Sequence, residues 1–117
     1  MNQDRILSMI GLATRAGAVT SGEFSVDKAI KAGKARLVII ADDASDRTKK
    51  GFKDSCSFYR VPLVIYKDKE TLGHSMGKQF RASLAILDKG FADSLLKKCR
   101  ELSDSQVEII EGGNADA

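Results

Sequence analysis

The chain has 117 residues, of which 43% are hydrophobic and 30% are charged, with a single proline and no tryptophan. This length fits one domain with one hydrophobic core, and the composition excludes disordered, collagen-like and coiled-coil proteins. No apolar run approaches the roughly 18 residues that a membrane span requires, and the first residues lack the basic and apolar regions of a signal peptide. We therefore expect a cytoplasmic protein without a membrane partner.

Positive charge is concentrated in the first 102 residues. All 19 lysines and arginines precede Ser103, but only 12 of the 16 acidic residues do. Residues 1–102 therefore carry a net charge of +7, whereas residues 103–117 carry −4. A basic domain of this kind has the electrostatic profile of a protein that binds polyanions. We expect residues 1–102 to form a single domain and residues 103–117 to form an acidic, flexible C-terminal tail.

Helical and strand patterns alternate along the domain. In chain order they predict a helix at 3–16, a strand at 19–21, a helix that ends at Gly33, a strand at 37–41, a helix from Ser45 to no further than Pro62, a strand at 63–66, a helix at 68–76, a strand at 84–87 and a helix at 91–102. Continuous apolar strands between helices indicate a sheet covered on both faces, which is a three-layer α/β/α sandwich. On the third and last helices, we expect these side chains to face the core: Phe52, Cys56, Tyr59, Phe91, Leu95, Leu96 and Cys99.

Catalytic and metal-binding patterns are weak. His74 and Ser75 are sequence neighbours, and neighbours in a helix point about 100° apart, so they cannot form a base–nucleophile pair. The glycines form neither a dinucleotide-binding motif nor a phosphate-binding loop. With one histidine and no CxxC pair, we expect no metal and no cofactor, and Cys56 and Cys99 are predicted to be free buried thiols of a reducing compartment.

One enzymatic interpretation remains open. Asp42 and Asp43 follow a buried strand, and Lys67 follows another, at the end of a sheet where open α/β folds place their sites. These residues suggest a receiver-like or metal-dependent enzyme. The alternative is that one of the carboxylates, or Ser45, caps the next helix.

Two segments carry the chemistry of nucleic-acid binding. The first, named here the turn segment, consists of Gly22, Glu23, Phe24, Ser25 and Lys28. It begins a helix whose free N–H groups suit a phosphate; glycine permits close approach, Glu23 offers hydrogen-bond acceptors to a base edge, and Phe24 offers a ring to an unstacked base. In the alternative interpretation, Phe24 enters the core and Glu23 stabilises the helix dipole.

The second segment, named here the basic loop, consists of Lys78, Gln79, Phe80 and Arg81. Two cations, an amide and an aromatic ring within four residues suit the recognition of an RNA loop, because they combine phosphate neutralisation with base stacking. The alternative is that Phe80 begins the following strand and is buried.

The chain up to about Leu96 resembles the kink-turn-binding ribosomal-protein superfamily, the seven-Ae and thirty-e large-subunit families. Within it, the chain looks most like the small bacterial members of the YlxQ type. The resemblance is carried by GLATRAG at 11–17, SGE at 21–23, KAIKAGKARLVIIA at 28–41, LGHSMGK at 72–78 and SLAI at 83–86. It implies a four-stranded mixed sheet in the sandwich, no cofactor, and RNA held at one end of the sheet.

In such proteins, the segment that begins the second helix meets the sheared G·A pairs of a kinked RNA, and the loop before the last strand contacts a flipped-out base. Kink-turn readers carry an Asn-Glu pair where this chain has Phe24 and Ser25, and the basic loop resembles the thirty-e version. We therefore expect a non-enzymatic, monomeric protein that binds structured RNA such as rRNA, with the ribosome or translation factors as further partners. The turn segment and the basic loop form its two walls, and Arg15 adds a phosphate contact. A protein-interaction module of the translation machinery is the third alternative.

Overall fold

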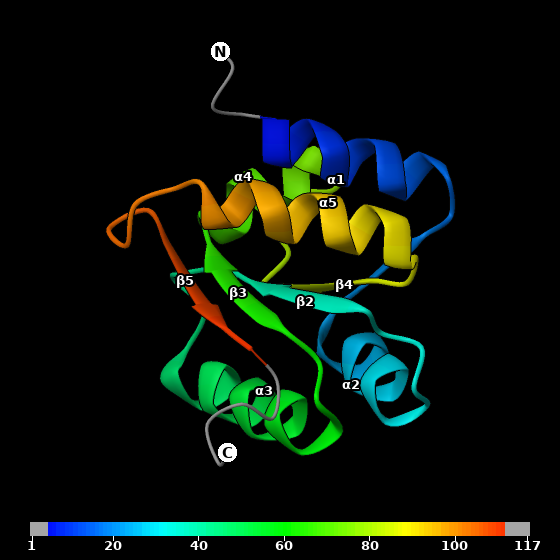
Figure 1. Ribbon diagram of the computed structural model, residues 1–117, viewed down its shortest axis with the longest axis vertical. Coiled ribbons are helices and arrows are strands. Elements are labelled where there is room, and N and C mark those ends of the chain that lie inside the picture. The colour runs from blue at the N-terminus through cyan, green and yellow to red at the C-terminus, as the bar shows by residue number, and fades with distance from the viewer. Residues whose placement is uncertain (1–4, 112–117) are drawn as a thin grey trace.

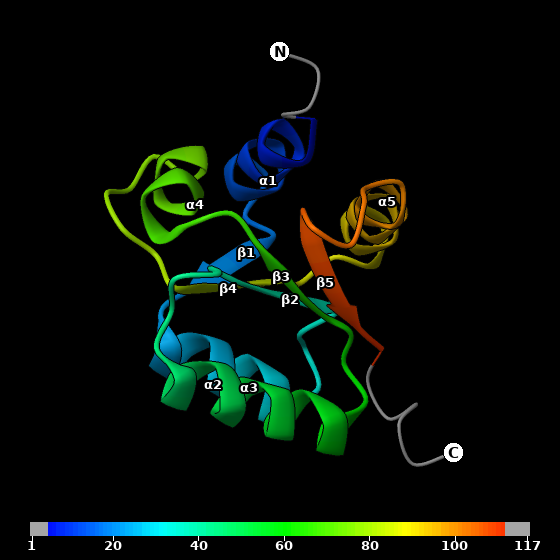
Figure 2. The same ribbon diagram turned by 90° about the vertical axis from the view of Figure 1, so that its left-hand side faces the viewer.

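A computed structural model describes residues 5–111 of the chain. It is a three-layer α/β/α sandwich (Figures 1 and 2). The helices α2 (Glu23–Lys31) and α3 (Asp46–Tyr59) cover one face of the central sheet. The helices α1 (Arg5–Arg15), α4 (Lys69–Ser75) and α5 (Lys89–Arg100) cover the other face. The predicted fold class is confirmed.

The sheet has five strands in the order β1-β4-β2-β3-β5. They span Val19–Ser21 (β1), Leu37–Ile40 (β2), Leu63–Tyr66 (β3), Ser83–Ile86 (β4) and Val107–Ile110 (β5). Only β2 and β3 pair in parallel, and the other pairs are antiparallel. β1, β2 and β3 therefore run in one direction and β4 and β5 in the other, so the predicted mixed sheet is confirmed.

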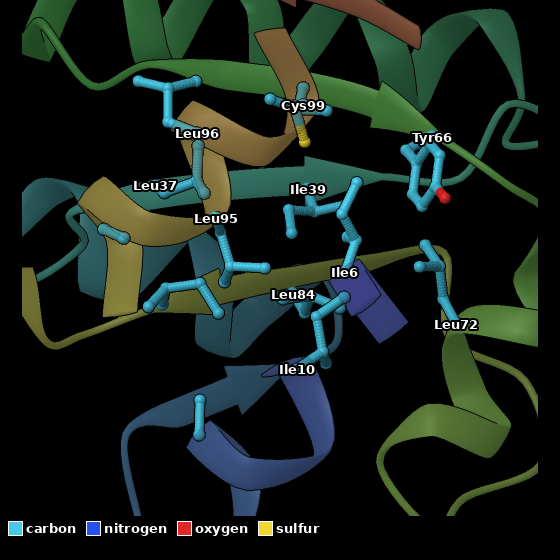
Figure 3. Packing of buried hydrophobic residues seen from close by; sticks show 14 of the residues in the cluster. Ile6, Ile10, Leu37, Ile39, Tyr66, Leu72, Leu84, Leu95, Leu96 and Cys99 are labelled. Atoms are coloured by element: carbon cyan, nitrogen blue, oxygen red, sulfur yellow. The ribbon is translucent and has the colours of Figure 1, made fainter. Parts of the chain in front are cut away.

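The side chains of the central strands alternate between two hydrophobic clusters. Leu37 and Ile39 of β2 join the cluster under α1, α4 and α5, which Figure 3 shows. Val38 and Ile40 point to the opposite face and pack with apolar residues of α2 and α3. Every residue of β2, β3 and β4 is buried, which explains their uninterrupted apolar sequences.

The helix boundaries follow the local signals in the sequence. The Ser45 hydroxyl accepts a hydrogen bond from the Thr48 N–H at the start of α3, as predicted. Gly17 and Gly33 have left-handed φ angles of 74° and 73° immediately after α1 and α2. Residues 3 and 4 of the predicted first helix lie outside the described residues.

One core assignment was wrong. Tyr59 is 42% exposed, because it lies in the last turn of α3, beyond the part of the helix that the sheet covers. Phe91, in the first turn of α5, is partly buried and packs against its cluster, so it faces the core as predicted. The Asp88 carboxylate caps this helix by accepting from the Phe91 N–H.

The tail prediction also needs correction. Residues 107–110 form β5, which pairs antiparallel with β3 and adds a fifth strand to the expected four. Val107 is buried, and Ile109 and Ile110 pack against the two clusters. These apolar residues cover the otherwise unpaired edge of β3, so the folded domain extends past residue 102 to at least Ile110. Residues 112–117 of the expected tail lie outside the described residues.

None of the helices within residues 5–111 has the length and apolar character needed to cross a bilayer.

Cys56 and Cys99 are free buried thiols, as predicted. They lie in different clusters, on opposite faces of the sheet, so the folded protein keeps them apart. Burial raises the pKa of the Cys56 thiol to about 12 and that of Cys99 to about 11. Neither thiol is therefore a nucleophile at neutral pH.

Two measurements check this thiol chemistry. Native protein is expected to react with a maleimide far more slowly than protein unfolded in urea, because labelling requires exposure of the thiol. The free energy of unfolding is expected to fall as pH rises from 9 towards 12, since an ordinary thiol with a pKa of 9.0 loses its proton in the unfolded chain first. Rapid labelling of native Cys56 or Cys99 would contradict the buried state.

Candidate nucleic-acid interface

The sheet topology gathers the predicted binding segments at one edge. The carboxyl ends of β1, β2 and β3 lie at the same edge, because these strands run in the same direction. The amino termini of α2, α3 and α4 follow from these strand ends. The basic loop arrives there too, since it leads from α4 into the antiparallel β4, and Figure 2 shows this connection descending beside the start of α2.

The turn segment is shaped by Gly22. This residue has φ 94° and ψ 150°, a conformation that only glycine adopts readily, and its N–H donates to the Ser83 carbonyl oxygen over 3.1 Å. The helix then begins at Glu23 without a side-chain cap. Phe24 is 78% exposed, and Glu23 and Lys28 are also exposed. The aromatic ring is therefore presented to solvent and is absent from the core.

Most side chains of the basic loop are also exposed to solvent. Lys78, Gln79 and Phe80 are exposed, and residue Phe80 is 58% accessible. The alternative in which Phe80 begins a buried strand is therefore wrong, because β4 begins only at Ser83. The Lys78 N–H donates to the Gly73 carbonyl oxygen over 2.8 Å, which holds the loop against α4.

The two segments are joined directly. The Arg81 Nε donates to the Ser21 hydroxyl over 3.0 Å, across 60 positions of sequence. Residue 21 also pairs with Leu84 in the β1–β4 ladder. The structure thus brings the turn segment and the basic loop to the same edge, with one exposed ring on each.

Arg15 lies elsewhere. It lines a hollow of about 640 Å³ between α1 and α4, together with Thr71, His74 and Ser75. This hollow belongs to the layer of α1, α4 and α5, whereas the turn segment begins the opposite layer. The Ser75 hydroxyl donates to the Leu72 carbonyl oxygen over 2.6 Å, so it is held by the backbone of its own helix.

A second hollow, of about 490 Å³, separates the first turns of α2 and α3. Glu23 and Phe24 line one side and Arg47 and Thr48 the other, and Phe52 lies at its base. Arg47 is not among the site residues that the sequence predicts. Its proximity to Phe24 follows from the parallel arrangement of α2 and α3, which local sequence does not reveal.

The acidic pair has a structural role. The Asp43 Oδ1 accepts from the Lys69 N–H over 2.9 Å at the start of α4, and Asp42 lies 3.9 Å from the Lys49 ammonium. The Lys67 ammonium lies 5.4 Å from the centre of the Tyr66 ring. A carboxylate does cap a helix, but Asp43 caps α4 and not the adjacent α3. Within residues 5–111 there is no group of three histidine, cysteine or acidic residues placed to hold a metal ion.

Comparison with known proteins shows the family to which the chain belongs. The sequence profile of the ribosomal protein L7Ae/L30e/S12e/Gadd45 family matches residues 4–96. The chain belongs to this family. The match includes the turn segment and the basic loop and ends before β5.

Individual proteins also resemble this chain in sequence or structure. The RNA-binding protein YlxQ of Bacillus subtilis is 42% identical over 75% of this chain and 88% of its own length. The RNA-binding protein YlxQ of Enterococcus faecium is 39% identical over 86% of this chain and 93% of its own length. A solved structure of a Bacillus halodurans protein of unknown function superposes with a TM-score of 0.81 at 36% identity, covering 83% of this chain and 98% of that one.

Proposed function

We propose that this protein is a non-enzymatic, monomeric RNA-binding protein of the cytoplasm. It recognises structured RNA, kink-turn-like or looped, of the translation machinery, and rRNA is the foremost candidate. The observation that carries the proposal is the pair of exposed rings, Phe24 and Phe80, on two segments that meet at one edge of the sheet. The two YlxQ relatives, which are named as RNA-binding proteins, support the same function.

The chemistry of this edge suits unpaired nucleotides better than a regular duplex. Exposed aromatic rings bind bases that have left the helical stack, because stacking needs an accessible base face. Lys28 and Lys78 supply positive charge for phosphates on either side. Gly22 lets the RNA backbone approach the start of α2, and the exposed Glu23 carboxylate accepts hydrogen bonds from base amino groups. Arg15 would add a phosphate contact from the α1–α4 hollow.

A titration tests the proposal. We expect the protein to bind a fluorescent RNA hairpin that has an internal loop with tandem G·A pairs and an extruded base. A fully paired hairpin of equal length and charge is expected to bind more weakly, since it offers no base to stack. The logarithm of the affinity should fall linearly with the logarithm of salt concentration, because phosphate contacts release counterions.

Fluorescence anisotropy at several salt concentrations measures both quantities. Equal affinity for the two hairpins would contradict recognition of structured RNA. Absence of salt-dependent binding would favour the protein-interaction module. NMR shifts at Asp42 and Asp43 that saturate with Mg²⁺ would instead support the enzymatic alternative.

A further inference from the structure

Arg81 differs from the other cation of the basic loop. Lys78 is exposed, whereas Arg81 is half-buried between the loop and β4. Its Nε donates to the Ser21 hydroxyl over 3.0 Å, and its Nη1 donates to the Phe80 carbonyl oxygen over 2.7 Å. Two donors of this guanidinium therefore point at the protein itself.

These bonds connect the turn segment and the basic loop next to Gly22 and at Phe80. Ser21 immediately precedes Gly22, where the turn segment begins, and the Phe80 carbonyl belongs to the residue whose ring is exposed. The Arg81 N–H also donates to the Lys69 carbonyl oxygen over 3.0 Å, which ties the same residue to the start of α4. One arginine thus links β1, α4 and the loop.

Gly73 provides the surface on which the loop lies. A Cβ atom at this position would lie 2.5 Å from the Gln79 carbonyl oxygen and 2.9 Å from the Phe80 nitrogen. The loop backbone therefore lies directly on the backbone of α4. Gly73 behind the loop and Arg81 at its end therefore hold the loop beside the turn segment.

We propose that Arg81 is a positioning residue, which holds the two walls at the spacing that RNA requires, and that it does not contact phosphate. This inference rests on the proposed function. The planar guanidinium donates to the Ser21 hydroxyl and to the Phe80 carbonyl oxygen at the same time, because its N–H groups diverge at fixed angles. A lysine ammonium on a flexible stem does not reproduce this geometry.

The test compares three single variants by titration with the looped RNA hairpin. Ser21→Ala is expected to weaken binding by about fivefold, the effect of one lost hydrogen bond, and Arg81→Lys by at least as much, because it also loses the bond to the Phe80 carbonyl oxygen; both variants should keep the wild-type salt slope. The double variant should bind no more weakly than Arg81→Lys alone, because both changes remove the same interaction. Lys28→Ala serves as the comparison, since loss of a phosphate contact lowers the salt slope by about one.

Wild-type affinity in Ser21→Ala, or full affinity in Arg81→Lys, would overturn the positioning role and indicate that only the charge of Arg81 matters. If the wild-type protein binds neither hairpin, the proposed RNA-binding function fails, and hydrogen exchange then decides the positioning role separately. Ser21→Ala should accelerate amide exchange in residues 78–81 of the free protein. Unchanged amide exchange in these residues would overturn the positioning role of Arg81.

Discussion

Phe80→Ala is expected to weaken binding of the looped RNA hairpin by about 1–3 kcal/mol, the free energy of a base stacked on an aromatic ring. Phe80 is 58% exposed in a loop outside the regular elements, so removal of its ring leaves no cavity in the core. The thermal midpoint should therefore stay close to that of the wild type. Anisotropy titration and thermal melting of the same sample measure both effects.

Phe58→Ala is the matched control. Phe58 is also strongly exposed, at 78%, but it lies in the last turn of α3, at the opposite edge of the sheet from the basic loop. Its removal should leave RNA affinity unchanged and reduce stability only by the loss of its edge-to-face contact with the Tyr59 ring, about 0.5–1.5 kcal/mol. Equal losses of affinity in both variants would show that surface aromatic residues act nonspecifically. A folded Phe80→Ala with wild-type affinity would remove Phe80 from the site.

Deletion of residues 103–117 is expected to reduce the free energy of unfolding by about 3–5 kcal/mol, because burial of one large apolar side chain contributes about 1.5–3 kcal/mol and β5 supplies three that are buried to different degrees. Val107 is 7% exposed, and Ile109 and Ile110 pack against opposite clusters. Urea denaturation followed by circular dichroism measures the loss.

Charge neutralisation separates the role of the strand from that of its acidic residues. The variant with Asp104→Asn, Glu108→Gln and Glu111→Gln keeps β5 but removes the negative charges within the strand and beside it. It should unfold nearly as the wild type does, since the Lys53–Glu108 and Arg100–Glu111 pairs are exposed and such pairs contribute little. At low salt it should bind RNA slightly more tightly. A deletion variant as stable as the wild type would show that β5 contributes nothing to the fold.

The layers of the fold were predictable because the local signals agree with one another. The apolar sequence at 37–40 has no polar residue to face water, so a strand there requires helices on both sides. Ser45, Gly17 and Gly33 mark helix ends by their own backbone chemistry. β5 escaped prediction because its four residues include Glu108 and follow a polar segment, and only pairing with β3 makes them a strand.

The candidate site was predictable in composition, but its geometry was not. Sequence identified the turn segment and the basic loop, yet the exposure of Phe24 and Phe80 depends on where neighbouring elements end. The contact of Arg81 with Ser21 follows from the β1–β4 pairing, which joins residues far apart in the chain. Asp43 caps α4 because β2 and β3 lie side by side, and this also requires knowledge of the sheet order.

The position of β5 has a consequence for folding during synthesis. β3 pairs with β2 on one side and β5 on the other, but residues 107–110 are synthesised after all four other strands. Before residues 107–110 have emerged and paired, the outer N–H and C=O groups of β3 remain open to another strand. Until β5 pairs, the apolar strand β3 is itself the edge of the sheet and is open to strand addition by neighbouring chains; once β5 has paired, the edge strand carries the exposed charged side chain of Glu108, which opposes such addition.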